Sequence, residues 1–143
     1  MRLGRYGKLM HFDSVRLGQG RIDRFTLFEF KPIGGIILNV FNSIEQDRFH
    51  THAFNAWSVM LRGSYAEEIR RQDAVVETRL RTRDVMYLPR HLEHRIMKST
   101  KNAVSVTICG PWRDTWTETS VSGRTRRFMW GRRQVAPDRK DSL

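Results

Sequence analysis

The sequence predicts a single all-β domain whose antiparallel strands form a sandwich or a barrel. Three observations favour this class. The chain has 143 residues, which suits one compact domain. Short runs of β-branched and aromatic residues recur along the chain, and glycine and proline separate them. No stretch sustains the i, i+3, i+4, i+7 apolar spacing of an amphipathic helix, so we expect strands to build the core.

The first predicted strands are rich in aromatic and aliphatic residues. Residues 25–30 (FTLFEF) end at Pro32, and residues 36–41 (IILNVF) follow a pair of glycines. Residues 56–61 (AWSVML) end just before Gly63. β-Branched and aromatic side chains favour extended backbone, whereas proline and glycine interrupt it, so each run is expected to be one strand.

The later strands are predicted in the same way. An extended run at residues 65–69 is followed by residues 75–80 (VVETRL), which alternate as a half-buried strand does. Residues 85–88 (VMYL) stop at Pro89, and residues 103–108 (AVSVTI) stop before a Gly–Pro pair. The spacing of these short strands is typical of an antiparallel fold rather than of βαβ units.

The charge balance predicts an anionic partner without identifying it. Lysine and arginine number 26 against 15 aspartate and glutamate residues, a formal net charge of +11. Such an excess attracts nucleic acid, phosphorylated metabolites or carboxylates. Arginine dominates lysine, and its planar fork suits phosphate and carboxylate. The alternative is that the excess reflects the composition of an arginine-rich genome.

Several classes of protein are excluded by what the sequence lacks. No apolar run approaches the eighteen residues of a membrane span, and no apolar core follows the basic N-terminus as in a secretory signal. We therefore expect no membrane partner and a cytoplasmic location. Cys109 is the single cysteine, which rules out an internal disulfide framework and a zinc site built of thiolates. We expect Cys109 to be buried and inert.

The histidines carry the clearest chemical signal. His50 and His52 share one face if they lie on a strand, because side chains alternate along it. His94 is the third candidate ligand. Imidazole binds iron, zinc, copper and nickel, so these three residues predict a metal site. His91, beside Pro89, is expected in a loop near the mouth of the fold.

The context of these histidines resembles the cupin superfamily, whose small jelly-roll barrels carry two sequence motifs. The first has a His-x-His pair, a glutamate and a glycine that closes the strand; the second has a glycine, an aspartate, a proline and a histidine. The matching residues are His50, His52 and Gly63 in the first motif and Asp84, Pro89 and His94 in the second. The resemblance implies an all-β, single-domain cupin jelly-roll over about residues 25–110.

The ends of the chain lie outside this resemblance and differ from the middle in composition. Residues 1–24 are an N-terminal segment, residues 111–137 a basic, aromatic extension packed on the barrel, and residues 138–143 a tail. The extension carries five arginines around Phe128, Met129 and Trp130. It is either a surface for single-stranded nucleic acid or a terminal strand whose aromatic side chains cover the sheet.

The motifs depart from the cupin pattern at one position that matters for the ligands. Ala56 stands where the first motif has its glutamate, and alanine cannot bind a metal. The implied ligand set is therefore His50, His52 and His94. It resembles the set of the three-histidine thiol dioxygenases, which hold ferrous iron, and of short cupin-like proteins of phages and bacteria. The resemblance implies a divalent metal, with Fe(II) first and zinc, nickel or manganese as alternatives.

Three neutral imidazoles leave a metal its full charge and an open coordination face. We expect nearby polar side chains to orient the imidazole rings. The candidates are Asn55, Ser58, Tyr65 and Glu67. The alternative is a barrel that keeps the three histidines without a metal.

Two functions remain. The first is an Fe(II)-dependent dioxygenase acting on a small anionic substrate, in which Arg62 or Arg95 clamps a carboxylate and Tyr65 or Tyr87 donates a hydrogen bond to oxygen. The second is a catalytically silent cupin that binds an anionic ligand, a nucleotide or nucleic acid. A metal analysis separates the two.

Because cupins commonly pair their sheets, the resemblance also implies a homodimer. The tryptophans near the C-terminus either cover that interface or cap the barrel. They are Trp112, Trp116 and Trp130.

Overall fold

The computed structural model describes residues 1–4, 6–16, 18–72, 74–113, 115–120, 124–129 and 133–140. Every regular element in these ranges is a β-strand, so no helix there could cross a membrane. The strands are β1 (Arg2–Leu3), β2 (Gly7–Val15), β3 (Gln19–Phe30), β4 (Gly34–Glu45), β5 (Arg48–His50), β6 (Ala56–Arg62), β7 (Ser64–Arg71), β8 (Ala74–Arg81), β9 (Val85–Leu88), β10 (Glu93–Ser99), β11 (Ala103–Cys109), β12 (Thr115–Ser120), β13 (Arg124–Met129) and β14 (Arg133–Lys140).

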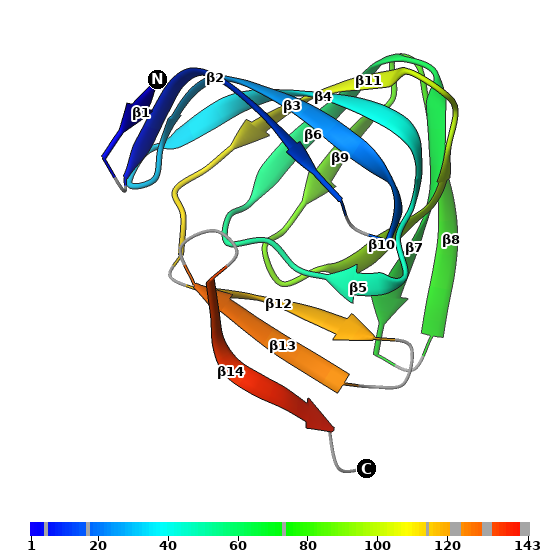
Figure 1. Ribbon diagram of the computed structural model, residues 1–143. Coiled ribbons are helices and arrows are strands. Elements are labelled where there is room, and N and C mark those ends of the chain that lie inside the picture. Colours follow the sequence, from blue (N-terminus) through cyan, green and yellow to red (C-terminus); the bar gives the residue numbers. More distant parts are fainter. Residues whose placement is uncertain are drawn as a thin grey trace.

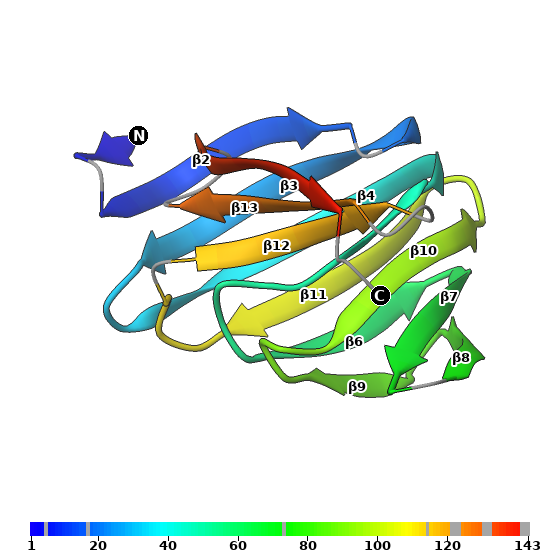
Figure 2. The same cartoon turned by 90° about the horizontal axis from the view of Figure 1, so that it is seen from below.

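The strands form two seven-stranded sheets that face one another as a rolled sandwich (Figures 1 and 2). Sheet A has the order β1-β2-β3-β4-β11-β6-β9, and sheet B has the order β14-β13-β12-β5-β10-β7-β8. All strand pairs between neighbours are antiparallel. The predicted all-β jelly-roll architecture is confirmed.

The sharp turn between β3 and β4 shows how glycine closes the sheet. Gly34 has φ +137°, and a Cβ atom there would collide with the backbone carbonyl of Cys109. Glycine readily adopts a positive φ and has no Cβ atom, so it fits this position where other residues would not. Sheet A can therefore place β4 directly against β11, with Gly35 opposite Cys109.

One end of the space between the sheets is filled with apolar side chains. The buried cluster consists of Phe41, Ile44, Met60, Tyr65, Leu80, Ile96 and Ala103. Its members come from β4, β6, β7, β8, β10 and β11, so the packing joins both sheets. We call this region the packed end.

The two ends of the chain add strands to the sheets. Residues 1–24, expected as an N-terminal segment, contain β2 and the start of β3, which pair along sheet A. In the C-terminal extension, Phe128 is buried and its ring stacks on Trp116 at 4.5 Å between centroids. Phe128 therefore covers the sheet, as the terminal-strand alternative predicts. Trp130, Arg132 and residues 141–143 lie outside the described residues.

Candidate metal centre

Two of the three candidate histidines face each other across neighbouring strands of sheet B. His50 is the last residue of β5, and His94 is its register partner on β10. Both side chains are buried between the sheets, and their ring centroids lie 4.5 Å apart. The β5–β10 pair thus brings together residues that are separated by more than forty positions in the sequence.

His52 joins them from the loop that follows β5. Its Nε2 lies 2.8 Å from Nε2 of His94, and its ring centroid lies 5.1 Å from that of His50. The expected single strand carrying both His50 and His52 is wrong, because β5 ends at His50. The loop is nonetheless fixed: the backbone N–H of His52 donates to the carbonyl of Arg90 at 3.2 Å. The three residues form what we call the histidine cluster.

The geometry of the histidine cluster fits one metal ion. One ring nitrogen from each residue lies within 4.8 Å of the other two. Metal–nitrogen bonds of about 2.1 Å would place two tetrahedral ligands about 3.4 Å apart, so small ring rotations suffice. Burial and the neighbouring His94 lower the pKa of His52 to about 3. His52 is therefore neutral at pH 7, as a ligand must be.

Glu67 on β7 orients His94. Its side chain is completely buried, and its Oε2 lies 2.9 Å from Nδ1 of His94. A carboxylate can only accept, so Nδ1 carries the proton and the lone pair of Nε2 faces the histidine cluster. This is the carboxylate–histidine arrangement that supports metal ligands. The other oxygen, Oε1, has no hydrogen-bond partner among the residues that the structure describes.

A second buried carboxylate lies next to His50. Glu118 on β12 is the register partner of His50, on the side opposite to β10. Its side chain is buried as well. Directly opposed residues of antiparallel strands point to the same face of the sheet. Each buried histidine therefore has an acidic neighbour, Glu67 for His94 and Glu118 for His50.

The histidine cluster opens into a cavity of about 240 Å³ between the sheets. On the side of sheet A the cavity is lined by a polar wall, which consists of Asn39, Ser58, Ser105 and Thr107. The Nδ2 group of Asn39 donates to Thr107 at 3.0 Å and to Ser105 at 3.3 Å. A cavity of this size with one polar wall can hold a small polar ligand opposite the histidines.

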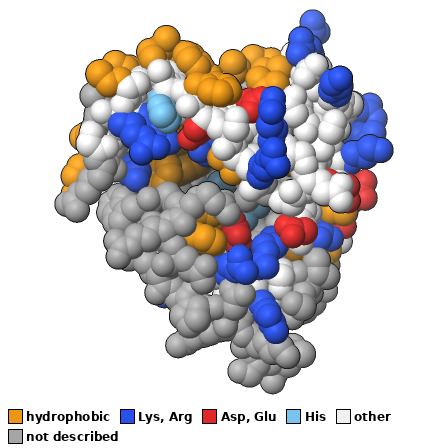
Figure 3. Space-filling model, in the orientation of Figure 1, with side chains coloured by type: hydrophobic (Ala, Val, Ile, Leu, Met, Phe, Trp, Pro, Cys, Tyr) orange, Lys and Arg blue, Asp and Glu red, His pale blue; other side chains and the backbone are white. Residues whose placement is uncertain are grey.

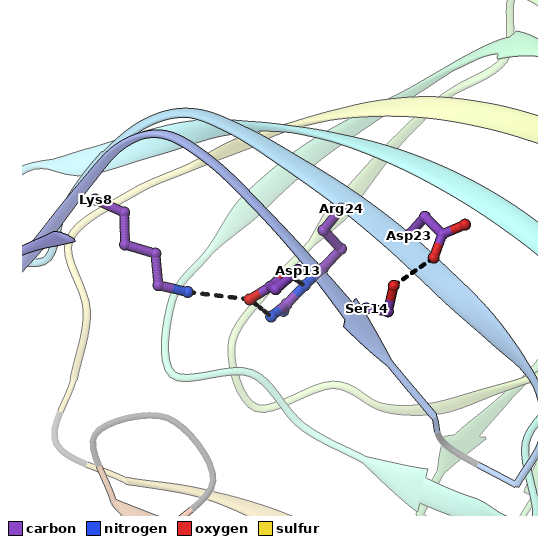
Figure 4. A network of polar contacts seen from close by, with 5 residues as sticks. All are labelled: Lys8, Asp13, Ser14, Asp23 and Arg24. Carbon is purple, nitrogen blue, oxygen red and sulfur yellow. Dashed lines mark hydrogen bonds and ion pairs between the residues drawn. The ribbon is translucent and has the colours of Figure 1, made fainter. Parts of the chain in front are cut away.

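A cationic group lines another part of this cavity. Arg24 on β3 makes a bidentate ion pair with Asp13 on β2, at 2.8 and 2.9 Å. Lys8 reaches the same carboxylate at 3.3 Å (Figure 4). Two cations share one anion, so the cationic group of Lys8, Asp13 and Arg24 keeps one positive charge. The sequence gives no sign of this group, because only the β2–β3 register brings its members together.

Aromatic side chains lie beside the histidine cluster. Phe54 stacks on His52 at 5.4 Å and contacts Trp112 at 5.1 Å, measured between ring centroids. Lys31 lies 4.9 Å from the centre of the Trp112 ring. Trp112 and Trp116 both line the cavity, which agrees with a capping role. The space-filling view shows the molecule hollowed here, with histidine atoms inside (Figure 3).

Of the two residues predicted to act directly on the substrate, one lines the cavity and the other does not. Tyr65 lines the cavity, and burial and the charge of Glu67 raise its pKa, while a hydrogen bond with Ser58 acts in the opposite direction. Arg62 does not line the cavity; it is exposed and donates to the carbonyl of Asn102 at 2.9 and 3.1 Å.

Two further candidates also point away from the cavity. Arg95 is paired with Glu68 at 2.8 Å on the outer side of sheet B. Tyr87 is exposed and lies against Trp57. His91 lies in an exposed turn, as expected for a loop residue.

No family model and no curated protein matches the sequence. Solved structures do match its fold. Oxalate decarboxylase from Bacillus subtilis is similar over 75% of this chain at a TM-score of 0.55 and 15% identity. The chain has the cupin fold. The chain spans only 29% of the length of the decarboxylase chain.

Two other solved structures support the same fold. The Fe(II) form of HppE matches 69% of this chain and 56% of its own chain, with a TM-score of 0.55 and 15% identity. KdgF from Halomonas sp. matches 71% of this chain and 88% of its own chain, with a TM-score of 0.54 and 16% identity. At such identities the comparisons establish the fold alone. The suitability of the site for a divalent metal rests on the histidine cluster.

Proposed function

We propose that this cupin binds Fe(II) through His50, His52 and His94 and oxidises a small anionic substrate with molecular oxygen. The observation that carries the proposal is the histidine cluster itself: three imidazole donors within 4.8 Å of one another, beside a cavity of about 240 Å³. A closed structural site would need a fourth ligand. Here Ala56, at the position of the cupin glutamate, leaves that side free.

Iron is favoured over the other divalent metals by the proposed chemistry. Imidazole ligands suit iron, zinc, copper and nickel alike. The similarity to the Fe(II) form of HppE supports iron. Bound Fe(II) would supply open coordination positions for substrate and oxygen. A cytoplasmic location, where thiols and Fe(II) stay reduced, is part of this proposal.

The residues around the cavity have distinct tasks. Glu67 holds His94 with its Nε2 lone pair toward the metal position. Arg24 and Lys8 attract the carboxylate of the substrate, in place of Arg62, which lies outside the cavity. Tyr65 keeps its proton because its pKa is raised, so its hydroxyl group can donate a hydrogen bond. Phe54 and Trp112 limit the access of water to the histidine cluster.

The test is anaerobic loading with Fe(II), followed by nitric oxide as a substitute for oxygen. Wild-type protein is expected to give the electron paramagnetic resonance signal of a high-spin iron nitrosyl, and His94→Ala is expected to give none. Loaded protein should also consume oxygen with small carboxylates, with Arg24→Gln raising the KM about 10-fold or more. Arg95→Gln is the matched control, because Arg95 lies outside the cavity.

The alternative is a catalytically silent cupin that binds an anionic ligand, a nucleotide or nucleic acid. The positive charge left on the cationic group of Lys8, Asp13 and Arg24 supports this binding role as much as it supports the dioxygenase. Iron-loaded protein that gives no nitrosyl signal would contradict the oxygenase and leave this binding role. Nucleic acid bound through Arg124, Arg126 and Arg127 would then appear as co-purified material that salt removes.

A further inference from the structure

A second pocket, of about 180 Å³, lies beside His50. Its lining includes three arginines, Arg16, Arg48 and Arg126, together with Asp47 and Glu118. His50 and Gln46 line both the pocket and the cavity, so the two spaces are neighbours. We call it the arginine pocket.

Sheet B positions two of the three arginines beside His50. Arg48 and His50 lie two residues apart on β5 and therefore point to the same face. Arg126 on β13 is opposite Glu118, which is opposite His50, so the three residues form one cross-strand row. The arginine pocket is therefore part of the same inner surface as the histidine cluster.

The third arginine, Arg16, directly follows β2 and reaches the pocket through a close contact of two turns. Gly18, in the turn after Arg16, has φ +83°, and a Cβ atom there would collide with the carbonyl of Glu45 and crowd the backbone of Asp47. Glycine allows the two turns to touch. Arg16 is thereby brought to the same pocket as Arg48.

The charges in the arginine pocket leave room for an anion. Three arginines and two acidic residues, Asp47 and Glu118, line it, which leaves a formal excess of one positive charge. The Nη1 atom of Arg48 is buried and has no hydrogen-bond partner within the described ranges. A buried donor without a partner is costly, and a charged one more so. A bound oxyanion would remove that cost by accepting from Arg48.

We propose that the arginine pocket binds a phosphate group. Guanidinium groups recognise phosphate through paired N–H donors. Arg16, Arg48 and Arg126 approach from three different segments, which suits a tetrahedral anion better than a planar carboxylate. The site is separate from the substrate position proposed above, and it needs no metal.

The test is isothermal titration of inorganic phosphate into metal-free protein, with acetate as the planar comparison. One saturable phosphate site per chain is expected, with acetate at least 10-fold weaker. Arg48→Gln should weaken phosphate binding at least 10-fold. Arg79→Gln is the control with the same change of charge, because Arg79 is exposed on β8.

Phosphate binding that does not saturate, or that is equal in wild type and Arg48→Gln, would overturn the proposal and show an adventitious ion only. If Arg48→Gln fails to fold, Arg16→Gln tests the same prediction from the segment that follows β2. Because the titration uses metal-free protein, its failure is distinct from a failure of the iron proposal.

Discussion

At the packed end of the barrel, Ile44 and Met60 are each 1% exposed and lie in a continuous apolar cluster. At the other end, which we call the hollow end, the histidine cluster and the polar wall face a cavity of about 240 Å³. Phe41, Tyr65 and Ile96 belong to both regions, because they are in the apolar cluster and also line the cavity. The packed end thus supplies the stability that allows the hollow end to carry buried polar groups and empty volume.

The hollow end is expected to be shielded from water. Cys109, at the end of β11, is buried, and burial together with nearby Glu29 raises its pKa to about 12. At pH 8 the thiolate fraction falls about 1,000-fold relative to an ordinary thiol with a pKa of about 9. Alkylation by iodoacetamide should therefore be about 1,000-fold slower in folded protein than in urea. Equal rates would show that water reaches this end freely.

Removing an apolar side chain should cost more at the packed end than at the hollow end. Ile44→Ala is expected to lower the free energy of unfolding by about 2–5 kcal/mol, since it opens a new void in a filled region. Ile37 is 7% exposed and lines the existing cavity. Ile37→Ala should cost less, about 2 kcal/mol. Urea unfolding measures both, and equal losses would contradict the distinction between the two ends.

The acidic neighbour of His94 should affect the metal more than the fold. Glu67→Gln keeps the shape but weakens the acceptor for Nδ1 of His94. Metal affinity is expected to fall about 10–100-fold. Glu68→Gln is the matched control, because Glu68 pairs with Arg95 outside the cavity. A competition titration with a chelator measures both variants, and equal affinities would show that Glu67 has no part in the site.

The polar wall should be the most tolerant region. Thr107→Val keeps the volume of the side chain but removes the acceptor for Asn39 at 3.0 Å. A loss of about 1 kcal/mol in the free energy of unfolding is expected, since one hydrogen bond beside a cavity is replaceable by water. A loss as large as that of Ile44→Ala would mean that the wall is structural and not open to a ligand.

Much of the fold could be predicted from local patterns. Each of the seven runs expected to be strands lies within an observed strand, because β-branched and aromatic residues with glycine or proline boundaries mark extended chain. β2 was not predicted: its sequence, GKLMHFDSV, mixes glycine, charge and apolar residues. Pairing with β3 along its whole length holds it extended. Tertiary context decides such strands.

The site could be predicted only as far as residue type and spacing allow. The three histidines were found because few side chains bind metals and two of them are two residues apart. Glu67 was one of four candidates for orienting them, and Arg62 was expected at the substrate. Which residues face inward depends on strand register, and a shift of one residue reverses every side chain. Register places Glu67 against His94 and leaves Arg62 outside.

The central claim is that His50, His52 and His94 together hold one divalent metal ion. The most direct measurement is the metal content of protein that has been loaded anaerobically with Fe(II) and then desalted. Wild type and His91→Ala, whose histidine lies in an exposed turn, should each retain about one iron per chain, and His94→Ala should retain almost none. Full iron content in folded His94→Ala, or none in the wild type, would contradict the account.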